Sequence, residues 1–511
     1  MKSRKNRILS GLLAGVLAAG LFAGCAKDGN ETGGGGGKDA AKDTIVIATM
    51  SETPSVNFTD HTATAGMYMN ILTYSTLFRV NMELKPEPLL VDTYKNVDDT
   101  HWEFKLKTGV KFHNGSELTA EDVKASLEWS KTFPETQLYN DDIAQVEVVD
   151  DHTIVITTDG PDAVLLDNLC SHGNSIVPKA LIDQGHDFGK EPIGTGPYKL
   201  VKWTRGDSLE FEAFDEYFGG APAIKHMIWK VIPEGSARTI ALEAGEVDFV
   251  VEVETMDFDR LNNAEGIKVL QYDSTDLNWL MLNNEKPGLD NRELRHAINC
   301  AINKENVVTV AQNGFAKPAI GQAQFNLAGY TDENADVYDP EKAKEWLAQS
   351  GIDPATVEMS IICSNDTKKR AGEVIQSNLQ EVLGINATIE SMDLATYLSV
   401  TAEGNYTASV GGYTSNTLVD YMVGVFSSKS INASNKTRTS VPELDALIEK
   451  AESTIDEAER TKILEQCTAL LNDLCPQAPL YQLIGLRAFN DDLKGVEVSP
   501  SGLIYFEKLS W

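Results

Sequence analysis

The chain has 511 residues, 76 of them acidic and 44 lysine or arginine, and its formal net charge at pH 7 is −32. So large an excess of carboxylates excludes nucleic acids and anionic lipid surfaces as expected partners, because both repel an acidic surface. The length is sufficient for two or three lobes rather than one small domain.

The first 24 residues have the pattern of an export signal. Four basic residues, Lys2, Arg4, Lys5 and Arg7, precede an apolar run over residues 8–24 that is too short and too rich in glycine and alanine for a membrane span of ~20 apolar residues. The run ends in Leu-Phe-Ala-Gly before Cys25, as a lipoprotein signal peptidase requires, although Phe22 stands where leucine is usual. We predict a signal peptide over 1–24 and lipidation of Cys25; a plain secretory signal with an incidental cysteine is the alternative.

Residues 25–43 are expected to form a flexible tether. They include a glycine run from Gly33 to Gly37, which cannot bury enough surface to offset the entropy of ordering it. Ordered structure is expected from Thr44. A lipid anchor, a tether and a folded body predict an extracytoplasmic receptor held at the cell membrane, in the periplasm where an outer membrane is present.

Patterns that indicate chemistry are missing from the sequence. Histidines never fall at metal-binding spacings, and no nucleophile elbow or phosphate-binding loop is present. An odd number of scattered cysteines besides Cys25 predicts buried thiols rather than a disulfide framework. These are Cys170, Cys300, Cys363, Cys467 and Cys475. We expect no catalytic residue, no metal and no cofactor, and keep a secreted enzyme as a remote alternative.

Strand and helix patterns alternate along the chain and predict a mixed α/β fold. Short buried or alternating strands are expected at 44–48 and 102–107, and a hairpin is expected over 146–157 with its turn at 150–152.

Helix ends are also marked in the sequence. Thr119 with Asp122 resembles a capping box and starts a helix to Lys131. Further helices are expected to begin at Asp290 and to run between Asp339 and Gly351, and a long amphipathic segment is expected over 440–476.

Four stretches resemble the family 5 solute-binding proteins, which include oligopeptide-, dipeptide- and nickel-binding lipoproteins. They are residues 102–123, with Gly-Val-Lys-Phe-His-Asn-Gly followed by Thr-Ala-Glu-Asp-Val; 192–198, Pro-Ile-Gly-Thr-Gly-Pro-Tyr; 283–299; and 478–481, Ala-Pro-Leu-Tyr. Asn114 replaces a commoner aspartate. Most of these residues are expected to be scaffold, with Gly194 and Gly196 allowing close backbone approach and His113 making structural hydrogen bonds.

The resemblance implies a periplasmic-binding-protein-like type II fold, with two lobes, a hinge and an inserted subdomain. Lobe Ia would comprise 44–75, 191–283 and 480–511; subdomain Ib would comprise 76–190; and lobe II would comprise 284–479. The chain would cross between lobes near Asn283 and Tyr481. A monomer that closes around its ligand and is recognised by an ABC permease is implied.

The resemblance also implies where a ligand binds. In peptide receptors of this family, the stretch matching 411–416 holds an aromatic residue and an aspartate that pairs with the peptide ammonium. Asn416 stands here in place of that aspartate; Asp420 could substitute, although a solvated carboxylate is the favoured interpretation of it. The predicted ligand-contacting residues are Asn57, Trp279, Asn283, Tyr413, Thr414, Asn416 and Tyr481. Lys368, Lys369 and Arg370 could bind a ligand carboxylate, but a solvent-exposed helix start is the favoured interpretation of them.

Two receptor hypotheses follow. The leading one is a peptide receptor, for oligopeptides or dipeptides. The alternative is a receptor of the same fold for an oligosaccharide, an opine-like compound or a nickel chelate, which the missing charge at Asn416 favours.

Overall fold

The computed structural model describes residues 42–61 and 64–511. The predicted signal peptide, Cys25 and residues 25–41 of the predicted tether lie outside the described residues. Within them, ordered structure begins with a strand at Thr44, as expected. No described helix is both long enough and apolar enough to cross a lipid bilayer.

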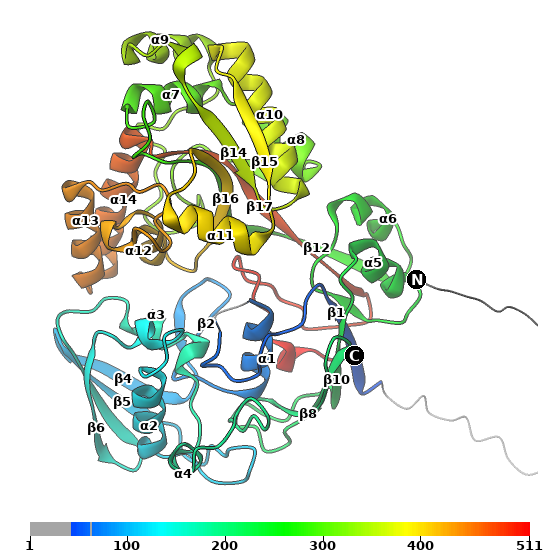
Figure 1. Cartoon of the computed structure of the whole chain (residues 1–511). Coiled ribbons are helices and arrows are strands. Elements are labelled where there is room, and N and C mark those ends of the chain that lie inside the picture. Colours follow the sequence, from blue (N-terminus) through cyan, green and yellow to red (C-terminus); the bar gives the residue numbers. More distant parts are fainter. Residues whose placement is uncertain (1–41, 62–63) are drawn as a thin grey trace, which may run out of the picture. The chain divides into compact units, whose positions relative to one another are not determined.

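Two long antiparallel strands, β12 (Ile267–Leu282) and β17 (Gln477–Asn490), form the middle of a large mixed sheet. Residues 267–273 of β12 pair with 484–490, residues 277–281 pair with 477–482, and the register shifts between Asp273 and Leu277. One half of this pair adjoins β11 and β1, and the other half adjoins β16. The two ends of the sheet are therefore joined through β12 and β17 (Figure 1).

The order of the strands across this sheet runs from β15 to β8. They are β15 (Ala387–Ser391), β14 (Met359–Cys363), β16 (Ala408–Thr414), β12, β17, β11 (Phe249–Val250), β1 (Thr44–Thr49), β10 (His226–Val231), β9 (Ser208–Ala213) and β8 (Tyr198–Thr204), with β13 (Ala316–Pro318) paired to β17. At the β1 end, the chain adds α1 (Thr64–Thr73), α5 (Gly235–Glu243) and α6 (Phe258–Asn262).

A separate four-stranded sheet lies within the predicted subdomain Ib. Its order is β4 (Val91–Asp98), β5 (His101–Leu106), β7 (Thr153–Thr158) and β6 (Ile143–Asp150). The β6–β7 pair confirms the expected hairpin. One core joins this sheet to α2 (Ala120–Ser130), because alternate strand residues such as Phe104 and Ile154 point to the helix side and are fully buried. The short elements here are β2 (Phe78–Val80), β3 (Pro86–Pro88), α3 (Leu165–Asn168) and α4 (Lys179–Asp183).

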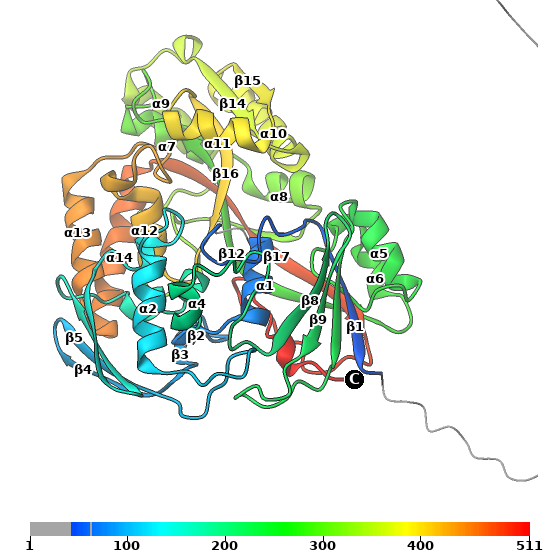
Figure 2. The same cartoon turned by 60° about the horizontal axis from the view of Figure 1, so that its bottom comes forward.

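Around β14–β16, helices form two cores on opposite faces of β12. Leu280 and Leu282 face one core, whereas Trp279 and Met281 face the other, as the two-residue period of a strand requires. The first core contains α7 (Arg292–Ala301), α8 (Lys304–Gln312), α9 (Pro340–Ser350) and α10 (Asp366–Leu383). The second contains α11 (Leu394–Glu403), α12 (Leu418–Phe426), α13 (Pro442–Ser453) and α14 (Glu457–Leu474). Figures 1 and 2 both show the first group around β14 and β15, with α12–α14 gathered apart from it.

The predicted helix ends are partly correct. α2 has the expected capping box at Thr119, and α9 lies between its N-cap Asp339 and left-handed Gly351. α7 was expected to start at Asp290, but its N-cap is Asn291, because the Asn291 side chain accepts from the Leu294 amide while Asp290 accepts from Gly288.

The expected single segment over 440–476 is two helices. The chain breaks between α13 and α14 because Asp456 caps a new helix start, its side chain accepting from the Glu459 amide.

The close backbone approach expected at two glycines is confirmed. A Cβ on Gly194 would lie 2.3 Å from Thr73 O, and one on Gly196 would lie 2.4 Å from Leu72 O. His113 packs against the same segment: its Nε2 donates to Gly196 O at 3.0 Å, and its backbone amide donates to Gly194 O at 2.8 Å. Burial lowers the pKa of His113 to about 4, so the ring is neutral and structural.

The described cysteines are unpaired thiols, as expected. Cys300, Cys363, Cys467 and Cys475 are buried, and Cys170 is partly buried. Burial raises the pKa of each of these thiols, and Cys475 holds the left-handed position that ends α14.

Candidate ligand-binding site

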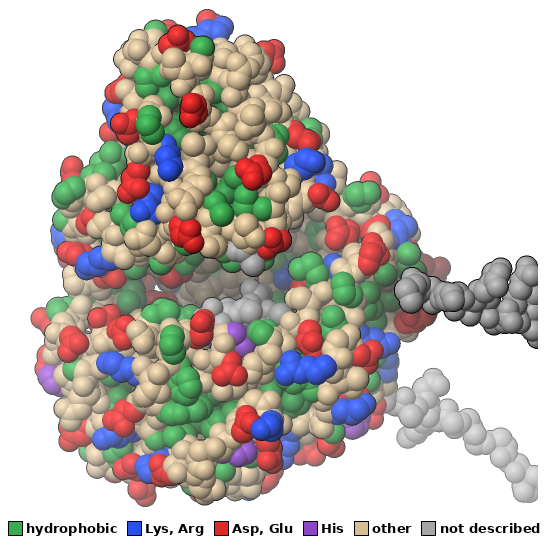
Figure 3. All heavy atoms as spheres, in the orientation of Figure 1, with side chains coloured by type: hydrophobic (Ala, Val, Ile, Leu, Met, Phe, Trp, Pro, Cys, Tyr) green, Lys and Arg blue, Asp and Glu red, His purple; other side chains and the backbone are tan. Residues whose placement is uncertain are grey.

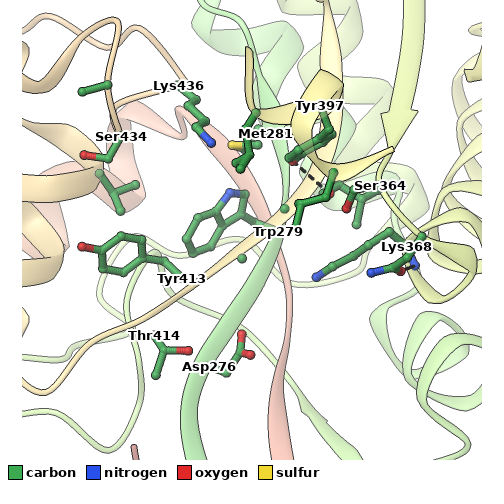
Figure 4. A pocket seen from close by; sticks show the side chains of 18 residues that line it. Asp276, Trp279, Met281, Ser364, Lys368, Tyr397, Tyr413, Thr414, Ser434 and Lys436 are labelled. Atoms are coloured by element: carbon green, nitrogen blue, oxygen red, sulfur yellow. Dashed lines mark hydrogen bonds between the residues drawn. The ribbon is translucent and has the colours of Figure 1, made fainter. Parts of the chain in front are cut away.

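A cavity of about 500 Å³ opens beside the C-terminal half of β16 (Figure 4). We call it the β16 pocket and define it by its lining residues. They are Asp276, Trp279, Met281, Ser364, Asn365, Lys368, Leu394, Tyr397, Leu398, Val410, Gly411, Gly412, Tyr413, Thr414, Val425, Ala433, Ser434 and Lys436. A volume of this size suits a few amino-acid side chains or a small organic molecule.

The walls of the pocket are largely apolar. Met281 and Tyr397 are buried, whereas Leu394 and Leu398 on α11 are 59% and 46% exposed. Figure 3 shows hydrophobic side chains over α11 at the border of a hollow in this face. Exposure of two leucines one helical turn apart to water is unfavourable, and an apolar part of a ligand would cover them.

The backbone of β16 has an open edge in the pocket. β14 pairs with β16 only at Ala408 and Ser409, and beyond them no strand of the described residues pairs with residues 410–414 on that side. The other side of these residues is paired with β12. The Val410 carbonyl already accepts from the Tyr397 hydroxyl at 3.1 Å. Any further unpaired N–H and C=O groups along this edge are a template on which an extended chain can add as a further strand.

Glycine is required at two positions along this edge. A Cβ on Gly411 would lie 2.7 Å from Met281 Cε and 2.9 Å from Tyr397 Oη, so a side chain here would narrow the pocket. A Cβ on Gly412 would lie 2.7 Å from Asn278 Oδ1 on the paired strand.

One end of the pocket carries a charged pair. Lys368, in the first turn of α10, donates to Asn278 Oδ1, and Asn278 Nδ2 donates to Asp276 Oδ1 at 2.8 Å. Burial raises the pKa of Asp276, and the charge of Lys368 opposes that shift. The favoured interpretation of Lys368 as solvated was therefore wrong, because α10 directs this side chain into the pocket (Figure 4), while Lys369 is exposed.

Other polar groups of the pocket have no partner. Trp279 is 3% exposed, and its indole Nε1 makes no hydrogen bond within the described residues. Lys436 forms no ion pair or side-chain hydrogen bond there; its Nζ lies 5.8 Å from the centre of the Tyr397 ring. Burial lowers the pKa of Lys436.

Of the predicted ligand-contacting residues, the structure brings Trp279, Tyr413 and Thr414 together in the pocket. Tyr481 lies outside the lining, fully buried, with its ring 6.0 Å from Lys368 Nζ and its hydroxyl without a partner. Asn416 is exposed just beyond β16 and does not line the pocket.

The side chains of two more predicted residues are already hydrogen-bonded to other parts of the protein. Asn283 is fully buried; its amide donates to Gly404 O and Tyr406 O, both at 3.0 Å, and accepts from Glu285 N. Asn57 donates to Asp60 Oδ1 at 2.9 Å within its own turn. Neither lines the β16 pocket.

Asp420 stands near Tyr413 in the first turn of α12. It is exposed to solvent, yet the surrounding protein raises its pKa to about 6, and its charge acts on Tyr413, Tyr139 and Asp167. It accepts no hydrogen bond from the described residues, which makes it available to a cation.

The sequence did not reveal several lining residues. Asp276 and Met281 lie on β12 and Lys436 lies far away in the sequence, and none of the three belongs to a motif. Leu394, Tyr397 and Leu398 had a usable signal, since their spacing places three apolar side chains on one helix face.

A possible metal cluster lies away from the pocket. Ligand atoms of His296, Asp336 and Cys475 are within 4.8 Å of one another and buried. His296 Nδ1 contacts Asp336 Oδ2 at 2.5 Å, and Nε2 contacts the Asp473 carbonyl at 2.8 Å. Both ring nitrogens are thus engaged with protein, and Lys342 also pairs with Asp336 at 3.2 Å. The cluster is a hydrogen-bonded part of the core.

Comparisons with known proteins all identify solute-binding proteins as similar to this chain. A family model described as bacterial extracellular solute-binding proteins, family 5 (Middle), matches residues 85–433. Heme-binding protein A of Haemophilus influenzae is 27% identical over 459 residues, covering 83% of this chain and 84% of that protein. The glutathione-binding protein GsiB of Escherichia coli is 27% identical over 517 residues, covering 98% of each.

A solved structure is similar in three dimensions. DppA from Helicobacter pylori, in complex with the peptide STSA, matches with a TM-score of 0.79 at 24% identity, over 91% of this chain and 98% of that chain. This likeness confirms the expected periplasmic-binding-protein-like α/β fold and, at this identity, leaves the solute open.

Proposed function

Because the chain belongs to the bacterial extracellular solute-binding proteins of family 5, which are receptors of ABC importers and not enzymes, we propose that its solute is a peptide. Members of this family act outside the cytoplasm, and so does this receptor. The single observation that carries the peptide assignment is the open edge of β16 at residues 410–414 beside the β16 pocket.

A peptide suits this edge better than a compact solute does. Its backbone would supply alternating donors and acceptors for the open edge at residues 411–414, and one of its side chains would enter the pocket. Because the hydrogen bonds are to main chain, the binding tolerates different sequences, and the pocket supplies the preference.

Two charged groups would hold the peptide ends. Asp420 would pair with the α-ammonium in place of the charge that Asn416 lacks. Lys368 would meet a carboxylate, in competition with its present partner Asn278. A desolvated ion pair of this kind holds a ligand and fixes its direction.

Ligand capture would proceed by closure of two lobes. We propose the division into lobe Ia (44–75, 191–283 and 480–511), subdomain Ib (76–190) and lobe II (284–479). β12 and β17 would form the hinge, which the register shift between Asp273 and Leu277 supports, because an interrupted ladder bends more easily than a regular one. The Ala163 amide already donates to Glu452 O at 2.8 Å across the proposed boundary.

We also propose that Cys25 is lipidated and tethers a monomeric receptor near its permease. The test is metabolic labelling with an alkyne fatty acid, which should mark the wild-type chain and not the Cys25→Ser variant. Labelling of that variant would contradict the proposal.

The receptor for a non-peptide solute is the second candidate. The observation that favours it is the exposed, uncharged Asn416 at the position where the resemblance expects an aspartate. An oligosaccharide, an opine-like compound or a nickel chelate would need no ammonium partner.

The deciding experiment is native mass spectrometry of the gently purified protein, followed by titration with matched peptides. A set of added masses that fragment into amino acids supports the peptide receptor; one discrete non-peptide mass supports the second candidate.

Titration then tests Asp420. Asp420→Asn should weaken peptides with a free N-terminus by about tenfold or more and leave their N-acetylated forms unchanged. Asn416→Asp should strengthen only the free forms. Equal effects on both forms would contradict the proposed ammonium site.

A further inference from the structure

The β16 pocket contains a cation, Lys436, that forms no ion pair with an acidic side chain among the described residues. Acidic residues outnumber basic ones by 76 to 44, and lysines such as Lys317 and Lys429 form ion pairs with carboxylates. Lys436 has no such partner although its Nζ is partly buried, and burial of an unpaired charge is costly. The protein therefore keeps an unfavourable group at a surface cavity.

The position of Lys436 is fixed by its neighbours. The buried amide of Asn435 donates to Phe426 O, Ser427 O and Thr439 O, and the Tyr406 hydroxyl donates to the Lys436 carbonyl. The backbone is thus held on both sides of the lysine. Only the side chain, passing the Tyr397 ring, is left to enter the pocket.

A second unpaired donor lies on the same side of the pocket. Figure 4 shows the indole nitrogen of Trp279 on the edge of its ring that faces the Lys436 ammonium. An ammonium and an indole N–H can only donate. Two donors without an acceptor among the described residues, one charged and one buried, call for an anionic acceptor in a pocket whose walls are largely apolar.

The opposite end of the pocket differs. Lys368 already has Asn278 and the nearby charge of Asp276, so a ligand anion there must compete with protein. Lys436 offers a ligand anion an uncontested partner.

We propose that Lys436 and Trp279 form an anion subsite that takes a carboxylate at the end of a short apolar stem, and that the receptor therefore prefers peptides with an acidic residue in the β16 pocket. This inference rests on the proposed peptide function. A C-terminal carboxylate has the same chemistry as an acidic side chain, and the two sources are separated below.

The test uses the purified protein and peptides that differ at one position, glutamate, glutamine or leucine, each as a free acid and as a C-terminal amide. Calorimetry should give glutamate peptides about tenfold or greater affinity over glutamine peptides, in both C-terminal forms. Lys436→Met should abolish this ratio, because glutamate peptides then bind no more tightly than glutamine peptides. Lys369→Met, which changes an exposed lysine outside the pocket, is the matched control and should keep the ratio.

A second measurement does not depend on peptide binding. Hexanoate and hexanamide share the apolar stem and differ in charge, and either should alter the fluorescence of Trp279, assigned by its loss in Trp279→Phe. Hexanoate should bind more tightly than hexanamide in the wild type and equally in Lys436→Met. If no peptide binds but hexanoate is still preferred, the peptide function fails and the anion subsite stands.

Two results would overturn the anion subsite, and a third would overturn only the preference for an acidic side chain. One is equal affinity for glutamate and glutamine peptides together with equal binding of the two hexyl probes. Another is a preference that Lys436→Met leaves intact. A preference that disappears on C-terminal amidation assigns the subsite to the terminal carboxylate and overturns the acidic side-chain preference.

Discussion

The turn at His113 and the β16 pocket differ in whether their polar groups are hydrogen-bonded. His113 satisfies both ring nitrogens with the segment 194–196, Nε2 to Gly196 O at 3.0 Å and Nδ1 with the Gly194 amide at 3.5 Å. In the pocket, the donors of Trp279 and Lys436 find no acceptor in the part of the chain that the structure describes. A buried polar group that is paired contributes to the fold, whereas one that is unpaired beside a cavity is a cost to the fold that a ligand removes. Changes at the turn should therefore alter stability, and changes in the pocket should mainly alter affinity.

The largest expected effect is at the turn. Gly196→Ala places a Cβ 2.4 Å from Leu72 O, and backbone cannot move away as a side-chain end can. We expect the free energy of unfolding in urea to fall by about 3 kcal/mol. Gly160→Ala is the control, because no atom lies within 4 Å of a Cβ there. Equal stability of the two variants would contradict the claim that the close contact at Gly196 stabilises the fold.

In the pocket, Gly411→Ala should reduce affinity more than stability. Its Cβ would meet the flexible end of Met281 at 2.7 Å and Tyr397 Oη at 2.9 Å, so the cavity narrows while the fold adjusts. We expect about tenfold weaker binding of the best peptide from the titration set, and a stability loss of about 1 kcal/mol. A larger loss of stability than of affinity would show that this glycine belongs to the scaffold.

Asp167, whose charge interacts with that of Asp420, is a partly buried polar group that affects stability in a pH-dependent way. Burial raises its pKa to about 7, helped by Asp420, Asp162 and Glu457 and opposed by Arg460. Between the unfolded pKa of about 4 and pH 7, the folded state keeps a proton that the unfolded state releases, so the free energy of unfolding falls as pH rises through this window.

Asp167→Asn removes that dependence. Allowing for partial exposure, we expect the variant to be more stable than wild type by about 1 kcal/mol at pH 8 and equal to it near pH 4. Thermal unfolding across this range provides the measurement. A difference that is constant with pH would mean that the carboxylate does not titrate as described.

The smallest effect is expected on α11. Leu394 is 59% exposed, so Leu394→Ser should change the free energy of unfolding by less than about 0.5 kcal/mol and weaken peptides with apolar side chains a few-fold. Val337→Ser, at a residue 53% exposed outside the pocket, should change neither quantity. Unchanged binding in the leucine variant would exclude α11 from ligand contact.

Local sequence determined much of the scaffold. Thr119 with Asp122, Asp339 with Gly351, and the β6–β7 hairpin were predictable because caps, turns and strand alternation depend on residues a few positions apart. The glycines at 194 and 196 were recognised through the family resemblance, and their reason is the approach of Leu72 and Thr73. The break before Asp456 was missed because the apolar spacing continues through it.

Only the tertiary structure decided which residues form the site. The β16 pocket joins β12, β16, α10, α11 and the segment around Lys436, and nothing local in any of them reports the others. Trp279, Tyr413 and Thr414 were anticipated because they lie on the two strands that the resemblance marked. Solvent exposure was favoured for Lys368 and ligand contact for Asn283. Instead, Lys368 lines the pocket and donates to Asn278, whereas Asn283 is buried and donates to Gly404 and Tyr406. The direction of a side chain depends on which distant segment packs against it.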